Sequence, residues 1–133
     1  MTLQERKDMA RQLRAEGYNC AQSVLLPFCD IIGLDRDTAA RLSSGLGSGM
    51  GATRELCGVA NAMAIAQGML QSPDPMAKGV SAKAAGELAR QFSSRNQGRL
   101  RCADLKGKEG IRPCNDLVED GVEILYNYFE SLK

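Results

Sequence analysis

Hydrophobic residues recur at helical spacing along most of this chain. Between Pro113 and Leu132, apolar side chains return every three or four residues, at Leu117, Val118, Val122, Leu125, Tyr126 and Phe129. A second helix is predicted from Cys20 to Ile32, and because it is apolar on most faces we expect it at the centre of the domain. No stretch of useful length alternates between apolar and polar residues, as a half-buried strand would. The pattern therefore predicts an all-α fold, a single-domain helical bundle of about five to seven helices over residues 1–133.

Capping and breaking residues divide the rest of the chain. Thr2 and Glu5 match a capping box that begins the first helix. Asn19 is the expected N-cap of the Cys20–Ile32 helix, which Pro27 should kink. Thr53 is the expected N-cap of a helix over residues 54–71. Residues 95–112 are polar and rich in glycine, and further helices or helical turns are predicted over residues 36–44, 75–94 and 102–105.

Composition and charge narrow the possible partners. The chain has 133 residues, of which 44% are hydrophobic and 25% charged, as is typical of one globular domain. A net charge of +1 and an aromatic content of 5% provide neither a field nor a stacking surface for nucleic acid, so we expect no nucleic-acid partner. The first residues lack the apolar run of a signal peptide, and the longest apolar stretch, Val24 to Leu34, is too short to cross a bilayer. We therefore expect a cytoplasmic protein without membrane insertion.

Five cysteines and no histidine direct attention to thiol chemistry. In a reducing cytosol, cysteines are more often metal ligands, redox thiols or nucleophiles than disulfide staples. The lack of histidine excludes Cys–His catalytic pairs and mixed Cys/His zinc sites. The chain also lacks a Cys-x-x-Cys motif, so neither a thioredoxin motif nor zinc-ribbon spacing is present.

Four of the cysteines fall at predicted helix starts, namely Cys20, Cys57, Cys102 and Cys114. The unpaired N–H groups and the positive dipole at a helix start stabilise a thiolate, and for Cys57, in the first turn of its helix, we expect a lowered pKa. Each cysteine alone could equally be a small buried hydrophobe, so the shared placement carries the argument. Cys29 lies nine residues after Cys20, on the opposite side of the helix and about 13 Å along it, so we assign it to core packing.

A glycine-rich connector precedes the helix that carries Cys57, with glycine at Gly45, Gly47, Gly49 and Gly51. No Gly-Lys-Ser/Thr follows it and no strand precedes it, so it matches neither a P-loop nor a dinucleotide-binding fingerprint. We interpret it as a tight turn that lets the backbone approach Cys57. Arg54 and Glu55 would adjust the Cys57 thiol if they faced it, although a solvated helix start is the simpler interpretation.

The cysteines and glycines follow a recognisable order: the segment Gly17-Tyr18-Asn19-Cys20-Ala21-Gln22, the Gly45–Gly51 run with its Met50, the pair Cys57-Gly58, then Cys102 and Cys114. This order resembles the C_GCAxxG_C_C family, whose members are described as redox-active, and the resemblance covers residues 17 to about 128. It implies that the family's four characteristic cysteines are Cys20, Cys57, Cys102 and Cys114. The family's Cys-Gly-Ala-x-x-Gly element is similar to residues 57–62, where Val59 replaces alanine and Ala62 replaces glycine.

Three functions are consistent with these residues. The leading hypothesis is a thiol redox protein with an unknown redox partner, in which Cys57 attacks and Cys102 and Cys114 form the resolving pair. The second is a metal-binding protein that holds an iron–sulfur cluster or zinc through the same four helix-start cysteines. The third is a helical interaction protein with structural cysteines, since the Ala/Gly-rich helix over residues 54–71 and the nearby Met69 and Met76 would suit a homodimer.

Overall fold

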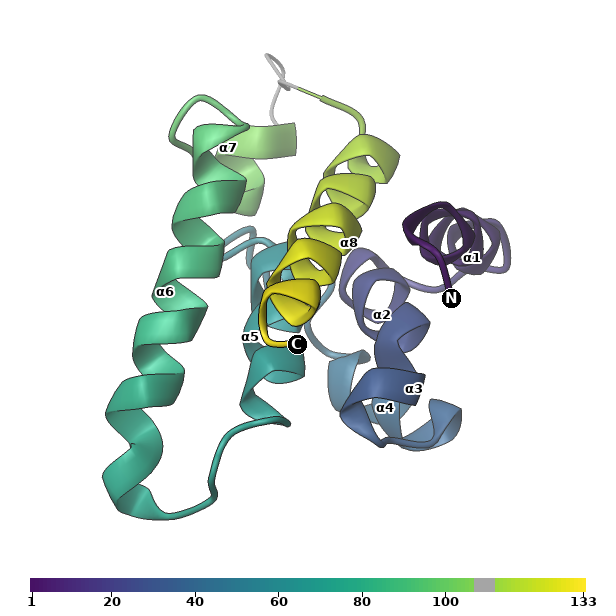
Figure 1. Cartoon of the computed structure of the whole chain (residues 1–133). Coiled ribbons are helices and arrows are strands. Elements are labelled where there is room, and N and C mark those ends of the chain that lie inside the picture. Colours follow the sequence, from purple (N-terminus) through teal and green to yellow (C-terminus); the bar gives the residue numbers. More distant parts are fainter. Residues whose placement is uncertain (107–111) are drawn as a thin grey trace.

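The computed structural model describes residues 1–106 and 112–133 and shows helices throughout (Figure 1). The helices are α1 (Leu3–Ala15), α2 (Cys20–Leu25), α3 (Cys29–Ile32), α4 (Arg36–Ser43), α5 (Gly58–Gly68), α6 (Lys78–Ser94), α7 (Cys102–Lys106) and α8 (Cys114–Ser131). A 3-10 turn at Leu26–Phe28 joins α2 to α3 and another at Pro75–Ala77 leads into α6, so the described residues form seven helical stretches and no strand. The predicted all-α fold of about five to seven helices is confirmed. Part of the predicted polar connector, residues 107–111, lies outside the described residues.

Side-chain caps fix the starts of α1 and α2 where the sequence predicts them. The Glu5 N–H donates to Thr2 Oγ1 at 3.1 Å, and the Thr2 N–H donates to Glu5 Oε1 at 3.0 Å. Asn19 and Gln22 form the same reciprocal pair at α2, with N–H to side-chain oxygen distances of 2.8 Å and 2.9 Å. Such capping boxes satisfy N–H groups that a helix leaves unpaired. The box at Asn19 places the next residue, Cys20, at the first position of α2.

Helix α2 lies at the centre of the bundle, as its apolar pattern predicts. It packs against α1, α4, α5 and α8, and Ala21, Val24 and Leu25 are completely inaccessible to solvent. The predicted kink at Pro27 is also confirmed, because α2 ends at Leu25 and the 3-10 turn containing Pro27 follows. The centre of the domain therefore contains the first of the helix-start cysteines.

Helix α5 approaches α8 closely at a glycine. Val59 is buried, and its Cγ1 lies so near Gly121 that a Cβ on that glycine would collide with it. The same Cβ would lie 3.3 Å from Cγ2 of Val24 on α2. Gly121 thus forms a notch that receives a branched side chain between three helices.

The predicted helix over residues 54–71 is wrong at its start. Thr53 does not cap a helix, because its hydroxyl donates to the Gly49 carbonyl at 2.7 Å. Arg54 has a φ of 63°, in the left-handed region that ends rather than begins helices. Helix α5 begins at Gly58, so Cys57 is its N-cap residue and does not lie inside the first turn. The cause is tertiary, since residues 54–57 are bonded to a distant part of the chain.

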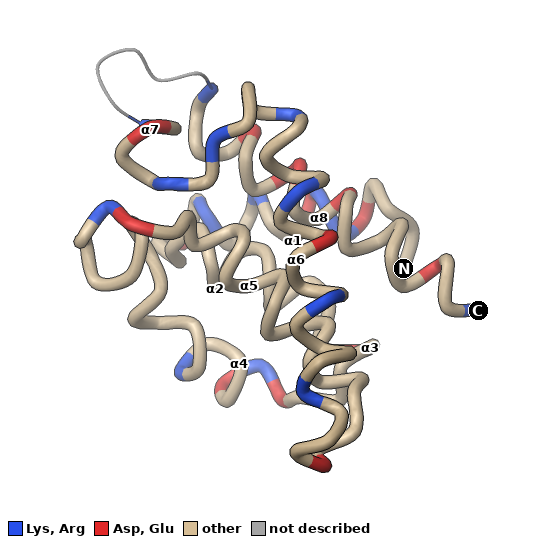
Figure 2. Tube along the Cα trace, turned by 90° about the vertical axis from the view of Figure 1, so that its left-hand side faces the viewer, with Lys and Arg blue, Asp and Glu red and all other residues tan. Residues whose placement is uncertain are grey.

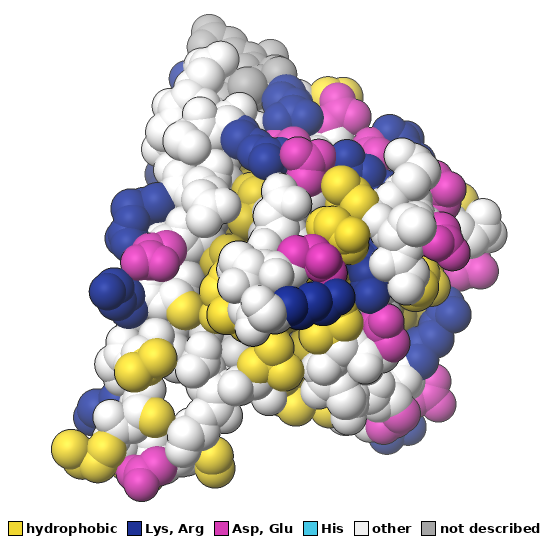
Figure 3. Space-filling view, viewed as in Figure 1, with side chains coloured by type: hydrophobic (Ala, Val, Ile, Leu, Met, Phe, Trp, Pro, Cys, Tyr) yellow, Lys and Arg dark blue, Asp and Glu magenta, His cyan; other side chains and the backbone are white. Residues whose placement is uncertain are grey.

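Charged and exposed apolar side chains are distributed differently over the surface. Positive and negative residues are interspersed along the helices (Figure 2). Exposed apolar side chains gather at the tip where α5 runs into α6 (Figure 3), and Met69 and Met76 there are 41% and 89% exposed. The exposure of these two methionines agrees with the surface that the sequence analysis proposed for a homodimer. The homodimer itself stays a prediction. None of the helices described is long and apolar enough to cross a membrane.

Arg6 on α1 is almost completely buried and joins α1 to the 3-10 turn after α2 and to α3. Its guanidinium donates to Asp30 Oδ1 at 2.7 Å, to Asp30 Oδ2 at 2.9 Å and to the Pro27 carbonyl at 2.6 Å. It also lies 5.0 Å from the centroid of the Phe28 ring. The hydrogen bonds from Arg6 lower the pKa of the Asp30 carboxyl, more than burial raises it.

Asp30→Asn is expected to destabilise the protein more at pH 7 than at pH 3. Because the pKa of Asp30 is lower in the folded state, its contribution is complete above about pH 4 and is lost as pH falls through the folded value. The Asp30 side chain is 49% exposed, and solvent screening limits the expected loss at pH 7 to about 1 kcal/mol. Urea unfolding of both proteins at the two pH values measures this difference. Asp37→Asn, at an exposed residue of α4, is the control, and an equal gap at both pH values would contradict the expectation.

Candidate functional site

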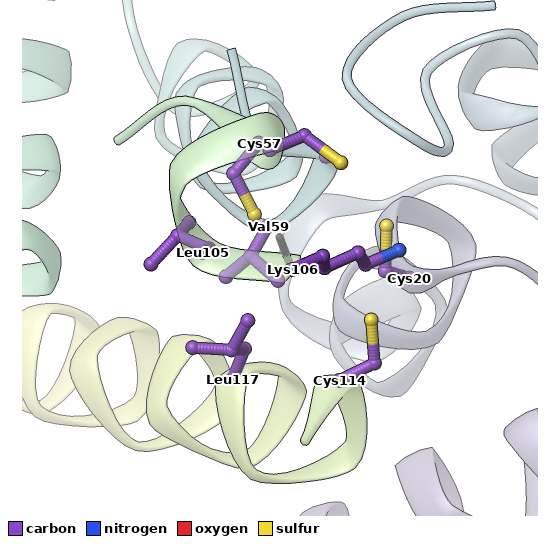
Figure 4. Close-up of a pocket in the computed structure, with 9 residues that line it drawn as sticks. Cys20, Cys57, Val59, Leu105, Lys106, Cys114 and Leu117 are labelled. Atoms are coloured by element: carbon purple, nitrogen blue, oxygen red, sulfur yellow. The ribbon is translucent and has the colours of Figure 1, made fainter. Parts of the chain in front are cut away.

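The four helix-start cysteines line one small pocket between α2, α5, α7 and α8 (Figure 4). Cys20, Cys102 and Cys114 are the first residues of α2, α7 and α8, and Cys57 is the residue before α5. The structure therefore brings together side chains that lie as far apart in sequence as residues 20 and 114. The other described residues that line the pocket are Gly58, Val59, Leu105, Lys106 and Leu117.

Access to the pocket differs among the cysteines. Cys20, Cys57 and Cys102 are 5%, 4% and 2% exposed, whereas Cys114 is only partly buried. The pocket is narrow, and the described residues leave no room in it for a water molecule. A reagent from solvent would therefore reach the group through Cys114.

Backbone pairing between residues 54–57 and 100–103 brings Cys57 next to Cys102. The Cys57 N–H donates to the Leu100 carbonyl at 2.9 Å, and the Cys102 N–H donates to the Glu55 carbonyl at 2.6 Å. Leu56 and Arg101 form an isolated antiparallel bridge between these two bonds. We call residues 54–57 and 100–103 the paired segments. These backbone bonds hold Leu56 and Cys57 in a bridge to the other segment, which explains why α5 begins at residue 58.

Glu55 does not face Cys57 and is turned to solvent. Its carboxylate accepts from Arg101 Nε at 3.1 Å, and both side chains are more than half exposed. An exposed ion pair of this kind contributes little to stability. Glu55 is solvated, as the simpler interpretation held, but it does not lie at a helix start, because α5 begins at Gly58.

Gly58 allows the sulfur of Cys20 to approach the start of α5. A Cβ at this position would lie 2.6 Å from Cys20 Sγ and 2.8 Å from the Leu46 carbonyl oxygen. Any side chain here would displace the thiol or the connector. The connector over residues 45–51 folds back onto the paired segment, since the Glu55 N–H donates to the Gly49 carbonyl at 3.1 Å. It is the tight turn beside Cys57 that the sequence predicts.

The expected low pKa of Cys57 is wrong. Burial raises the pKa of the Cys57 thiol to about 12. The N–H groups of Val59 and Ala60 at the start of α5 lower it, but by less, and the charges of Cys20 and Cys102 raise it further. Removing the thiolate from water thus outweighs the helix start. Cys57 is a neutral thiol at physiological pH and is not suited to be the attacking group.

Lys106 is a pocket residue that the sequence analysis missed. In Figure 4 its amine points between Cys20 and Cys114. Burial by itself lowers the pKa of Lys106, but hydrogen bonding to Cys114 and the charges of Cys114, Cys20 and Cys102 outweigh it, and the pKa is raised. A signal was present in the sequence, because a residue four positions after Cys102 shares its face of a helical turn.

Cys29 stands apart from the other cysteines. It begins α3, does not line the pocket and packs against the core as a partly buried side chain. Burial and the charges of Asp30 and Asp35 raise its pKa. Its separation from Cys20 agrees with the helical geometry used to set it aside.

The described residues do not fit a metal centre. No three histidine, cysteine, aspartate or glutamate side chains among residues 1–106 and 112–133 are arranged so that they could hold a metal ion. The pocket cysteines are also close to an amine, which would repel a cation. The structure therefore offers no support for the predicted iron–sulfur or zinc site.

Fold and pocket together define a class: an all-helical protein that gathers four unpaired cysteines at helix starts around one pocket. A family model described as "Putative redox-active protein (C_GCAxxG_C_C)" matches residues 18–128, and the chain belongs to this family. The match includes all four pocket cysteines. The comparisons with curated proteins and with solved structures each found no match.

Proposed function

We propose that this protein is a thiol–disulfide redox protein that uses the pocket cysteines to reduce an external disulfide. The observation that carries the proposal is the meeting of Cys20, Cys57, Cys102 and Cys114, all of them free thiols, at one pocket. A dithiol cycle needs a second thiol close enough to attack the mixed disulfide formed by the first, and thiols that share a pocket meet this requirement. Membership of a family described as redox-active supports the same class of chemistry.

Cys114 replaces Cys57 as the proposed attacking group. It is the least buried of the pocket cysteines, and it begins the 18-residue helix α8. The N–H groups at such a helix start stabilise a thiolate. Cys57, by contrast, is 4% exposed and its pKa is raised to about 12.

The proposed cycle transfers two electrons. The Cys114 thiolate attacks one sulfur of the external disulfide, so a Cys114–sulfur bond forms while the external S–S bond breaks and the first thiolate leaves. Cys20, whose sulfur faces the same amine as Cys114 in Figure 4, then attacks the Cys114 sulfur. A Cys20–Cys114 disulfide forms and the second external thiolate leaves. The proton of the Cys20 thiol and one proton from water convert the two released thiolates into thiols.

Thiol counting before and after exposure to oxidised glutathione tests the proposal. The protein, purified without oxygen, is expected to show five free thiols before treatment and to lose two of them, and peptide mapping is expected to find Cys20 joined to Cys114. Cys29→Ser should still lose two thiols, because Cys29 does not line the pocket. Cys114→Ser should lose none through an internal disulfide.

Two results would contradict this function. The first is an unchanged number of free thiols after treatment, which would leave the cysteines as packing residues. The second is broad visible absorbance with stoichiometric iron, or stoichiometric zinc, in the purified protein. Either metal result would favour the metal-binding alternative and would show that the described arrangement changes when metal binds.

A further inference from the structure

Lys106 is the one charged side chain among the described residues that line the pocket. Its neighbours there are the four cysteines and the apolar residues Gly58, Val59, Leu105 and Leu117. No carboxylate lines the described part of the pocket, so the titratable groups facing one another are four thiols and one amine. A thiolate formed inside the pocket therefore has this amine as its counter-charge.

Lys106 reaches the pocket because α7 carries it there. The paired segments fix the start of α7, since the Cys102 N–H donates to the Glu55 carbonyl and the Ala103 N–H donates to the Arg54 carbonyl at 3.1 Å. Lys106 ends α7, and its side chain extends toward the sulfurs of Cys20 and Cys114 (Figure 4). The same backbone pairing that places Cys102 thus also orients the amine.

Lys106 interacts more strongly with Cys114 than with the other pocket sulfurs. A partly buried amine normally has a lowered pKa, yet the pKa of Lys106 is raised, with Cys114 the largest opposing influence. A positive charge held beside a sulfur favours the charged thiolate over the neutral thiol. Of the three sulfurs that act on Lys106, Cys114 contributes most.

We propose that Lys106 is the positioning residue that selects Cys114 as the attacking thiolate, by holding a positive charge against its sulfur. This inference rests on the proposed thiol–disulfide function. The cysteines then have different roles: the amine of Lys106 favours a thiolate at Cys114, which is partly exposed, while Cys57 and Cys102 stay buried.

A consequence follows for the redox equilibrium. Lys106 stabilises a thiolate, which exists only in the reduced protein, so it disfavours the Cys20–Cys114 disulfide. Lys106→Gln is therefore expected to shift the equilibrium with glutathione toward the disulfide by about tenfold, which corresponds to about 30 mV for a two-electron couple. The lysine makes the disulfide form of the protein a better oxidant.

The decisive experiment measures iodoacetamide alkylation of each cysteine by peptide mass spectrometry, because this reaction needs a thiolate but no disulfide chemistry. In Lys106→Gln, alkylation of Cys114 at pH 7 is expected to be about tenfold slower than in the unmodified protein. The difference should disappear at alkaline pH, where the thiol ionises without help. Lys106→Arg should retain most of the rate, since it keeps the charge, and Lys83→Gln, an exposed residue of α6, should leave the rate unchanged.

An unchanged alkylation rate of Cys114 in Lys106→Gln would overturn the inference, provided that circular dichroism shows the helical fold intact. Equal slowing at every pH would also overturn it, because a change of access and not of charge would then be responsible. The test is independent of the proposed function. A protein that forms no internal disulfide but shows the charge effect would refute the redox cycle and leave the pairing of Lys106 with Cys114 in place.

Discussion

Between pH 9 and pH 12, the free energy of unfolding is expected to fall by roughly 3–4 kcal/mol more in the unmodified protein than in a Cys57→Ser variant. The reason is that the pKa of Cys57 is raised to about 12 in the folded protein. A folded-state pKa above the unfolded value means that the folded protein retains the thiol proton more tightly. The contribution is therefore complete below about pH 9 and is lost as pH rises through 12. Burial is the cause, since a thiolate at this position would be removed from water.

Urea unfolding at a series of pH values measures this effect. Serine is a suitable replacement, because it is a preferred N-cap residue and Cys57 is the N-cap of α5. Lysine and tyrosine residues also titrate in this range, so the result is the difference between the two proteins and not either curve alone. Cys29→Ser is the matched control, as Cys29 is only partly buried. Parallel curves for the Cys57→Ser variant and the unmodified protein would show that Cys57 is not held as a buried neutral thiol.

Gly121→Ala is expected to destabilise the protein by about 2 kcal/mol, because the added Cβ would overpack the contact with Val59. In a Val59→Ala background the same substitution is expected to be neutral or stabilising. The smaller side chain frees the space, and alanine is about 1 kcal/mol better than glycine in a helix interior. The pair should therefore show a coupling energy of about 2 kcal/mol or more.

A double-mutant cycle by chemical denaturation checks this coupling. Gly79→Ala on α6 is the control, since no heavy atom lies within 4 Å of the added Cβ. It should not lower the stability. Additive effects of Gly121→Ala and Val59→Ala would refute the notch at Gly121.

Local signals in the sequence predicted much of the fold. The capping boxes at Thr2 and Asn19 act within four residues, so the starts of α1 and α2 could be inferred without the rest of the molecule. Pro27 interrupts the predicted helix because a proline in a helix interior lacks the N–H that the helix needs. The periodic apolar face of α8 identified Leu117, Val118 and Val122 as core residues, and all three are buried. Elements that depend on neighbouring residues were thus predictable.

Features that depend on distant residues were not. Thr53 resembles an N-cap, but hydrogen bonds to residues 100–103 hold residues 54–57 in a non-helical conformation. The helix start alone predicts a lowered pKa for Cys57, whereas burial by other elements raises it. Lys106 shares a helical face with Cys102, but its place beside Cys20 and Cys114 depends on how α2, α7 and α8 meet at the pocket. Sequence identified the four cysteines of the pocket but not the charge that accompanies them or the order of their reactivity.

The distance along the chain between the pocket residues affects how the protein is made. Synthesis proceeds from the N-terminus, so Cys20, Cys57 and Cys102 leave the ribosome before Cys114 and the helix that it begins. During that interval α8 cannot yet cover α2 and α5, against which it packs in the finished protein. In the newly made chain, the thiols of Cys20, Cys57 and Cys102 therefore lack the cover of α8 until α8 has formed. Until then, these thiols are exposed to pairings that the folded structure would not allow.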